Sequence, residues 1–205
     1  MRSAEFDCQK VLRAAMTAFM HKGYGKTSMQ DLKKATGLHP GSIYCAFDSK
    51  RGLLLAALGQ YKKDRNSEFN DFFPGKAAVL TELKHYLDHI VQECLSCDAS
   101  KACLLTKALN ELADQDDEIQ GIVTENLAGW QQSITMLFEQ AKVKGELSTQ
   151  RDSEHLARYF VMGVYGLRTF AQTHPKAHVL QQLADQLYHD VCYEPAPKIA
   201  EQVVN

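Results

Sequence analysis

The sequence predicts an all-α protein of about nine helices. Apolar residues recur at helical spacing along the chain, no segment alternates apolar and polar residues long enough to form a strand, and long stretches contain neither proline nor glycine. The 205 residues include only five prolines, and 45% are apolar, as in an ordinary globular protein. No run of 18 apolar residues occurs, so no membrane span is predicted, and the six irregularly spaced cysteines indicate reduced thiols in the cytoplasm.

Four helices are expected in the first third of the chain. Gly23 ends the first, Thr27 or Ser28 caps the second, Pro40 occupies the first turn of a very short third helix, and Ser49 caps the fourth. The predicted ranges are residues 4–22, 28–35, 39–45 and 50–71. A loop follows at residues 72–75, where two phenylalanines precede Pro-Gly.

Five longer helices are expected in the remainder. Their predicted ranges are residues 76–95, 101–113, 116–144, 152–172 and 176–193. Gly145 ends the third of these, and Pro175 separates the last two. The chain is therefore divided into an N-terminal domain of residues 1–50, a larger helical domain of residues 51–193, and a frayed tail of residues 194–205.

Charge is distributed unevenly along the chain. Residues 1–65 contain twelve Lys and Arg against five Asp and Glu, whereas residues 66–205 contain eleven against twenty. A basic segment followed by an acidic one favours a polyanionic partner for the first part. A chance distribution of solvated charges is the alternative.

The second and third predicted helices form a helix-turn-helix. Two short helices are joined by a turn at Gly37, which can adopt a left-handed conformation. Leu32, Leu38, Ile43 and Phe47 are the expected core contacts, which leaves the other face of the third helix free to enter a major groove. An αα-hairpin that only packs is the alternative.

Candidate DNA contacts surround this motif. Hydroxyl, imidazole and ammonium groups lie on its outward face or flank it, and helix N-termini favour phosphate. The predicted contacts are Lys26, Thr27, Ser28, His39, Pro40, Ser42, Tyr44 and Lys50.

This region resembles the DNA-binding domain of TetR-family transcriptional regulators. The resemblance rests on the segments GYGKTSM (residues 23–29), ATGL (35–38) and GSIYCAFDSKRGLL (41–54), and covers about residues 4–60. The third helix begins His-Pro-Gly where the family often has Ser-Lys-Gly, so no operator sequence can be carried over. A weaker resemblance to one subgroup extends through the C-terminal half.

The resemblance implies a dimeric regulator, usually a repressor, that binds near-palindromic double-stranded DNA. It also implies that the last two helices form the dimer and that the middle helices enclose a pocket for a small-molecule effector. Aromatic and apolar residues on those helices are the candidate lining, although plain core packing is the alternative for each. The candidates are Tyr86, Ile90, Trp130, Phe138, Phe160 and Tyr165.

Two glycines inside the eighth predicted helix support a close helix contact. Gly163 and Gly166 each cost about 1 kcal/mol relative to alanine in a helix. Close approach of another helix would offset that cost. A homodimer through helices eight and nine is therefore expected, with burial inside one chain as the alternative.

Cysteine chemistry is a second candidate for effector control. Cys103 is expected in the first turn of the sixth helix, where backbone amides, Lys101 and Lys107 would stabilise a thiolate. Cys97 is near enough to act as a resolving thiol. The alternative for Cys103 is a small buried hydrophobic residue.

No metal site, cofactor or enzymatic activity is predicted. His85 and His89 are expected on the helix face opposite Cys94, so these residues cannot share one ion. The chain lacks a glycine-rich phosphate loop, a Gly-x-Ser-x-Gly motif and zinc-type His-Glu spacing. A helical adaptor that binds only proteins is the alternative to a DNA-binding regulator.

Overall fold

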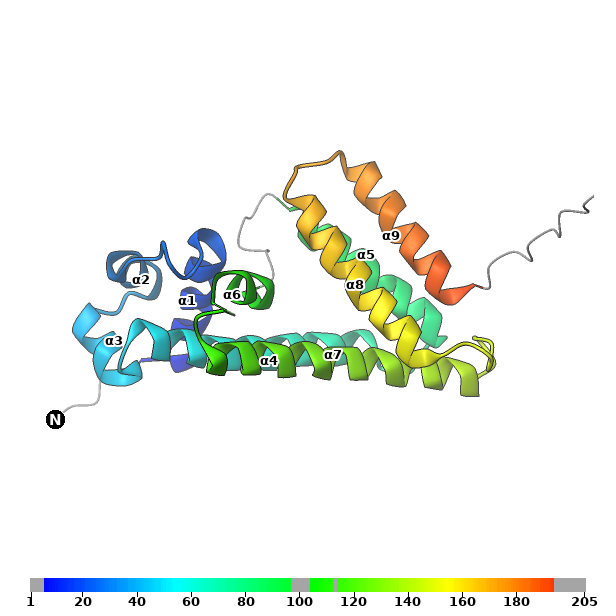
Figure 1. Ribbon diagram of the computed structural model, residues 1–205, viewed down its shortest axis with the longest axis horizontal. Helices are drawn as coiled ribbons and strands as arrows, with labels where there is room; N and C mark the ends of the chain where they lie inside the picture. Colours follow the sequence, from blue (N-terminus) through cyan, green and yellow to red (C-terminus); the bar gives the residue numbers. More distant parts are fainter. Residues whose placement is uncertain (1–5, 97–103, 113, 194–205) are drawn as a thin grey trace, which may run out of the picture.

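The computed structural model describes residues 6–96, 104–112 and 114–193, and in these ranges the chain forms nine helices and no strand (Figure 1). The helices are α1 (Cys8–Lys22), α2 (Met29–Thr36), α3 (Pro40–Phe47), α4 (Lys50–Phe72), α5 (Val79–Leu95), α6 (Leu104–Leu112), α7 (Asp117–Val143), α8 (Ser153–Ala171) and α9 (Ala177–Cys192). The all-α prediction is confirmed. None of these helices is both long enough and apolar enough to cross a bilayer.

Helices α1 and α5 begin several residues later than the sequence predicted, and side chains explain why. The carboxylate of Asp7 accepts a hydrogen bond from the Lys10 amide, which caps α1 just before Cys8. At α5, the Glu146 carboxylate accepts from the first two helical amides, those of Val79 and Leu80, while Glu82 accepts from the amides of Lys76 and Ala77 ahead of the helix. The first amides of a helix lack intrahelical partners, so a side-chain acceptor determines where it begins.

The two ends of the molecule are connected by two long helices. Helices α1–α3 gather at one end with α6 beside them, and α5, α8 and α9 pack at the other (Figure 1). Between them, α4 and α7 run alongside each other and contribute residues to both ends. We call α1–α3 the head.

The head shares its core with later elements. Phe19, Leu32 and Ile43 are buried together with residues of α4, α6 and the first two turns of α7. The α4 contribution is Leu53, Leu54, Ala57, Leu58 and Tyr61. The core of the head therefore continues past residue 50, where the sequence suggested a domain boundary.

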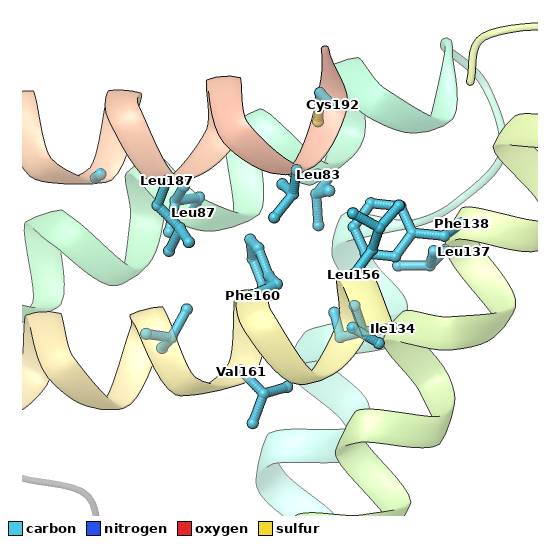
Figure 2. Close-up of a cluster of buried hydrophobic side chains, with 14 of the residues drawn as sticks. Leu83, Leu87, Ile134, Leu137, Phe138, Leu156, Phe160, Val161, Leu187 and Cys192 are labelled. Atoms are coloured by element: carbon cyan, nitrogen blue, oxygen red, sulfur yellow. The ribbon is translucent and has the colours of Figure 1, made fainter. Parts of the chain in front are cut away.

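A second core holds the other end together. Its side chains come from α5, α7, α8 and α9, and Phe138 and Phe160 lie fully buried near its centre (Figure 2). Arg151 donates hydrogen bonds to the carbonyls of Asp190, Val191 and Tyr193, which fixes the end of α9. The outer faces of α8 and α9 remain exposed.

Candidate DNA-binding surface and effector cavity

Caps fix both ends of α2 and the start of α3 in the helix-turn-helix. Ser28 and Asp31 form a capping box, in which the Ser28 hydroxyl accepts from the Asp31 amide and the Asp31 carboxylate accepts from the Ser28 amide. Gly37 ends α2 with φ 72°, in the left-handed region. His39 caps α3 by accepting a hydrogen bond of 3.3 Å from the Gly41 amide at Nδ1.

Most of the predicted DNA contacts are at least partly accessible at the surface of the head. Lys26, Ser28 and His39 are exposed, and Tyr44 keeps 49% of its surface accessible. Pro40 and Ser42 are half-buried in the first turn of α3. As expected, Leu32 and Ile43 are buried and Leu38 and Phe47 pack against them.

The expectation that the Thr27 hydroxyl contacts phosphate is wrong. Thr27 is 1% exposed, and its hydroxyl donates a hydrogen bond of 2.6 Å to the Gly23 carbonyl. The cap of α2 is Ser28, so Thr27 holds the chain between α1 and α2 instead.

Lys50 is partly engaged within the chain. Its Nζ donates to the Gly25 carbonyl at 3.4 Å and lies 4.4 Å from the centre of the Tyr24 ring. Burial lowers the pKa of Lys50. A phosphate contact by Lys50 therefore requires these interactions to be exchanged, whereas Lys26 is exposed.

Two polar contacts join α6 to the head, and a third joins the start of α7 to α4. Lys107 donates to the Met20 carbonyl at the end of α1, and Glu111 accepts a 2.9 Å hydrogen bond from the Gly25 amide. Arg51, at the start of α4, donates to both carboxylate oxygens of Asp116 at 2.6 and 2.8 Å. These contacts tie α6 directly to the head and the start of α7 to α4.

A cavity of about 250 Å³ lies among the middle helices. It is walled by α4, α5, α7 and α8, with Leu105 of α6 at its edge. The lining is Tyr61, Lys62, Arg65, Asn66, Phe69, Asn70, Tyr86, Leu105, Asn126, Leu127, Gly129, Trp130, Ser133, Tyr165 and Arg168.

Three of the six predicted lining residues face this cavity. Tyr86, Trp130 and Tyr165 line it, and the rings of Trp130 and Tyr165 lie 5.7 Å apart. The prediction is wrong for Ile90, Phe138 and Phe160, which are at most 1% exposed in the solid C-terminal core (Figure 2 labels Phe138 and Phe160).

Two buried donors in the cavity lack a hydrogen-bond partner. Asn126 is 8% exposed, and neither its Nδ2 nor the Nε1 of Trp130 has a partner. A buried polar group without a partner costs about 1–3 kcal/mol. A bound molecule with an acceptor would recover that cost.

Two arginines beside the cavity share one carboxylate. Arg65 of α4 and Arg168 of α8 donate to opposite oxygens of Glu93 on α5, at 2.9 and 2.8 Å. Burial acts to raise the pKa of Glu93, but the charges of Arg168 and Arg65 outweigh it and hold the pKa below its usual value. Neither arginine is among the residues predicted from the sequence, and neither is Asn126.

Glu68, His89 and Glu93 form a cluster whose ligand atoms lie within 4.8 Å of one another. Both carboxylates are already paired, because Arg65 contacts Glu68 and Glu93, and His89 lies 2.8 Å from Glu68. The geometry therefore defines an ion-pair network beside the cavity.

The proposed sensor thiols, Cys97 and Cys103, lie outside the described residues. Among the others, Cys8 and Cys45 are exposed, Cys94 is half-buried and Cys192 is buried. Burial raises the pKa of Cys94, and it raises that of Cys192 to about 12. These two are therefore poor nucleophiles at neutral pH.

An exposed apolar strip runs along α8 and α9. Met162, Phe170 and Leu183 are 60%, 40% and 45% exposed around a shallow groove of about 290 Å³. Gly166 opens onto this groove with no atom near its Cβ position, whereas a Cβ on Gly163 would lie 2.5 Å from Leu187 of α9. Packing against α9 within the same chain therefore accounts for the glycine at position 163. Of the two glycines, Gly166 is the one left accessible to another molecule.

A capped helix-turn-helix joined to a helical domain with a lined cavity defines a DNA-binding transcriptional regulator. The family model described as "Bacterial regulatory proteins, tetR family" matches residues 11–57, and that described as "Tetracyclin repressor-like, C-terminal domain" matches residues 79–187. The chain belongs to the TetR family, whose members regulate transcription by binding operator DNA as dimers and are not enzymes.

Curated relatives span nearly the same length. The transcriptional repressor ComR of Escherichia coli K12 is 26% identical over 185 residues, which cover 89% of this chain and 88% of ComR. The uncharacterized regulator YezE of Bacillus subtilis is also 26% identical over 185 residues, covering 90% and 95%. The transcriptional regulator AcuR of Cereibacter sphaeroides is 26% identical over 159 residues, covering 77% and 73%.

Solved structures share the fold. A cysteine variant of the TetR-family regulator CifR in complex with a 26-base-pair operator superposes with a TM-score of 0.81 at 23% identity, covering 92% of this chain and 99% of that one. A TetR-family regulator from Agrobacterium tumefaciens gives 0.81 at 18% identity, covering 91% and 97%.

Proposed function

We propose that the protein is a repressor that binds a near-palindromic operator as a homodimer and leaves it when a small molecule fills the cavity. One observation carries this proposal: of two consecutive residues of α4, one binds the head and the next lines the cavity. Asp64 binds Arg13 of α1 through two hydrogen bonds of 2.7 and 2.8 Å, while Arg65 lines the cavity. A ligand that moves α4 would therefore move the head.

DNA recognition is assigned to α3 and its flanks. His39 and Ser42 are proposed to read base edges, and Tyr44 and Lys26 to contact phosphates. An operator would be selected from a random duplex library with the purified full chain, and its affinity measured over a range of salt concentrations.

Lys26→Ala is expected to weaken binding to all sequences and to reduce the salt slope by about one. Ser42→Ala is expected to change preference at one base pair by about 1–3 kcal/mol. Equal binding of all sequences by the wild type would contradict the assignment.

The dimer is assigned to the apolar strip of α8 and α9. Burying Met162, Phe170 and Leu183 against a second copy would remove their apolar surface from water. Leu183→Glu is expected to yield monomers in sedimentation velocity. Val143→Glu is the matched control, because Val143 is 88% exposed and lies on α7 outside the strip. Dimers that survive Leu183→Glu would place the interface elsewhere.

Effector control is tested by filling the cavity. Gly129 lines it and has no atom within 4 Å of its Cβ position, so Gly129→Met would occupy the space. Gly121→Met is the control, since that glycine of α7 is equally open but lies outside the cavity. Compounds that raise the melting temperature should release operator DNA from wild type and Gly121→Met, and not from Gly129→Met. Release from all three would contradict control through this cavity.

Thiol modification is the second candidate for control. Burial raises the pKa values of Cys94 and Cys192, so alkylation is expected to favour other cysteines. Cys45 is exposed on α3, and its modification would block DNA directly. The test is therefore made in a Cys45→Ser background, where loss of operator binding that depends on Cys103 would support a sensor at that position.

A further inference from the structure

We propose that the effector is an aromatic carboxylate of one or two rings, held by hydrogen bonds from Asn126 and Trp130 and by the positive charge of Arg65 and Arg168. This inference rests on the proposed function only in treating the ligand of the cavity as the effector. It concerns binding, which can be measured without DNA.

The unpartnered atoms of the cavity are donors. The Asn126 side chain is more than nine-tenths buried, its Nδ2 has no partner, and the indole Nε1 of Trp130 is likewise unpaired. An indole N–H can only donate a hydrogen bond. A ligand that presents acceptors to the α7 wall would satisfy these donors, and a carboxylate supplies two oxygens.

Every charged side chain that lines the cavity is positive. These side chains are Lys62, Arg65 and Arg168, and no aspartate or glutamate is among the lining residues. Each of these cations is paired with a carboxylate outside the lining: Arg65 with Glu68 and Glu93, Arg168 with Glu93, and Lys62 with Glu125. A carboxylate loses its hydration on entry and is bound only where charged or neutral donors replace it. The cationic groups that line this cavity are donors, and their partner carboxylates do not face it, so an organic cation would find no carboxylate there.

The rest of the wall is aromatic. Tyr61, Phe69, Tyr86, Trp130 and Tyr165 face the space, and such rings prefer edge-to-face or offset contact with another ring. A cavity of about 150 Å³ holds one benzene molecule. The 250 Å³ available here would accommodate one or two rings with a short acidic chain. Aromatic walls can also bind cations through their ring faces, and the lining charge opposes that alternative.

The test compares head groups on a constant ring. Phenylpropanoate, phenylpropanamide and phenylpropylammonium form one series, and naphthylacetate, naphthylacetamide and naphthylethylammonium form a two-ring series. Titration calorimetry with the full chain gives each affinity. Trp130 is the only tryptophan of the sequence, so quenching or enhancement of its fluorescence reports occupancy of this cavity directly.

In at least one series, the carboxylate should bind about tenfold or more tightly than the amide, and the ammonium should bind most weakly. Asn126→Leu and Trp130→Phe should each weaken carboxylate binding about tenfold. Asn110→Leu is the matched control for the first, because Asn110 is an exposed asparagine of α6. Arg168→Met should remove the preference for the carboxylate, and Arg158→Met, at an exposed position of α8, should not. Melting temperatures confirm that each variant is folded.

Two results would overturn the inference: an ammonium that binds as tightly as its carboxylate, or no saturable binding of either carboxylate. Operator release is measured separately by fluorescence anisotropy. Carboxylate binding without release would leave the ligand class standing and contradict the proposed function. Release by the ammonium compounds alone would support control through a small molecule and contradict the inferred ligand class.

Discussion

The head and the cavity region satisfy their polar groups differently. In the described part of the head, every buried side-chain polar atom has a partner, and the Thr27 hydroxyl, Ser28 and Asp31 all serve backbone groups. In the cavity, Asn126 and Trp130 keep buried donors without one. The difference teaches that the head is built to hold one shape, whereas the cavity region keeps unpartnered donors that a bound acceptor would satisfy.

The largest expected effect tests the solid core beside the cavity. Phe160→Ala should lower the free energy of unfolding by about 3–5 kcal/mol, because Phe160 is fully buried and its loss creates a void. Chemical denaturation measures the change. A loss below about 1 kcal/mol would show that this end of the molecule is loosely packed throughout, and the contrast between core and cavity would fail.

The next effect tests the rigidity of the head. Gly23 has φ 79° and ψ 163°, a region almost restricted to glycine, and a Cβ there would overlap the Glu111 carboxylate. Gly23→Ala should cost about 1–3 kcal/mol. Gly59→Ala, at an open position inside α4, should stabilise by about 0.5–1 kcal/mol instead. Thermal unfolding of both variants gives the comparison, and equal effects would contradict it.

A smaller effect of opposite sign is expected in the cavity. Asn126→Leu removes an unpartnered buried donor, so the ligand-free protein should become more stable by about 1 kcal/mol. Asn110→Leu, on the exposed face of α6, should change stability by less than about 0.5 kcal/mol. Destabilisation by Asn126→Leu would mean that the amide is already satisfied in solution.

The smallest expected effect is on the stability of the protein at low pH. A hydrogen bond from Arg51 lowers the pKa of Asp116 from 3.8 to about 2, so the stability contributed by this pair is present above pH 3.8 and is lost as the pH falls towards 2. Asp116→Asn retains an oxygen to cap α7 but removes the charge. Between pH 3.8 and pH 2, the free energy of unfolding of this variant should fall less steeply than that of the wild type, as measured by denaturation curves at a series of pH values. Identical slopes would contradict the contribution of the Arg51–Asp116 pair.

Local patterns predicted the helices and the head well. Ser28, Gly37, Ser49 and Gly145 mark helix ends in the sequence, and all four mark helix ends in the structure. These signals act over one turn, so a sequence carries them directly. Thr27 was misassigned because it and the true cap, Ser28, both carry a hydroxyl group and both suit the position before a helix.

The cavity was only partly predictable, because periodicity indicates a helix face and not its depth. Phe138 and Trp130 both lie on buried faces of α7, yet one fills the core and the other lines the cavity. Arg65 and Arg168 meet through Glu93 across three helices, which no local pattern reveals. One signal was available, since Asn126 interrupts the apolar stripe of Ile119, Val123 and Ile134.

The contacts of α6 with the head affect how the DNA preference of such a protein can evolve. Lys107 and Glu111 bind the carbonyl of Met20 and the amide of Gly25, which are main-chain atoms. Substitutions on the DNA-reading face of α3 leave these two contacts intact, since neither uses a side chain of the head. The DNA sequence that α3 prefers can therefore change over generations while the connection between α6 and the head stays the same.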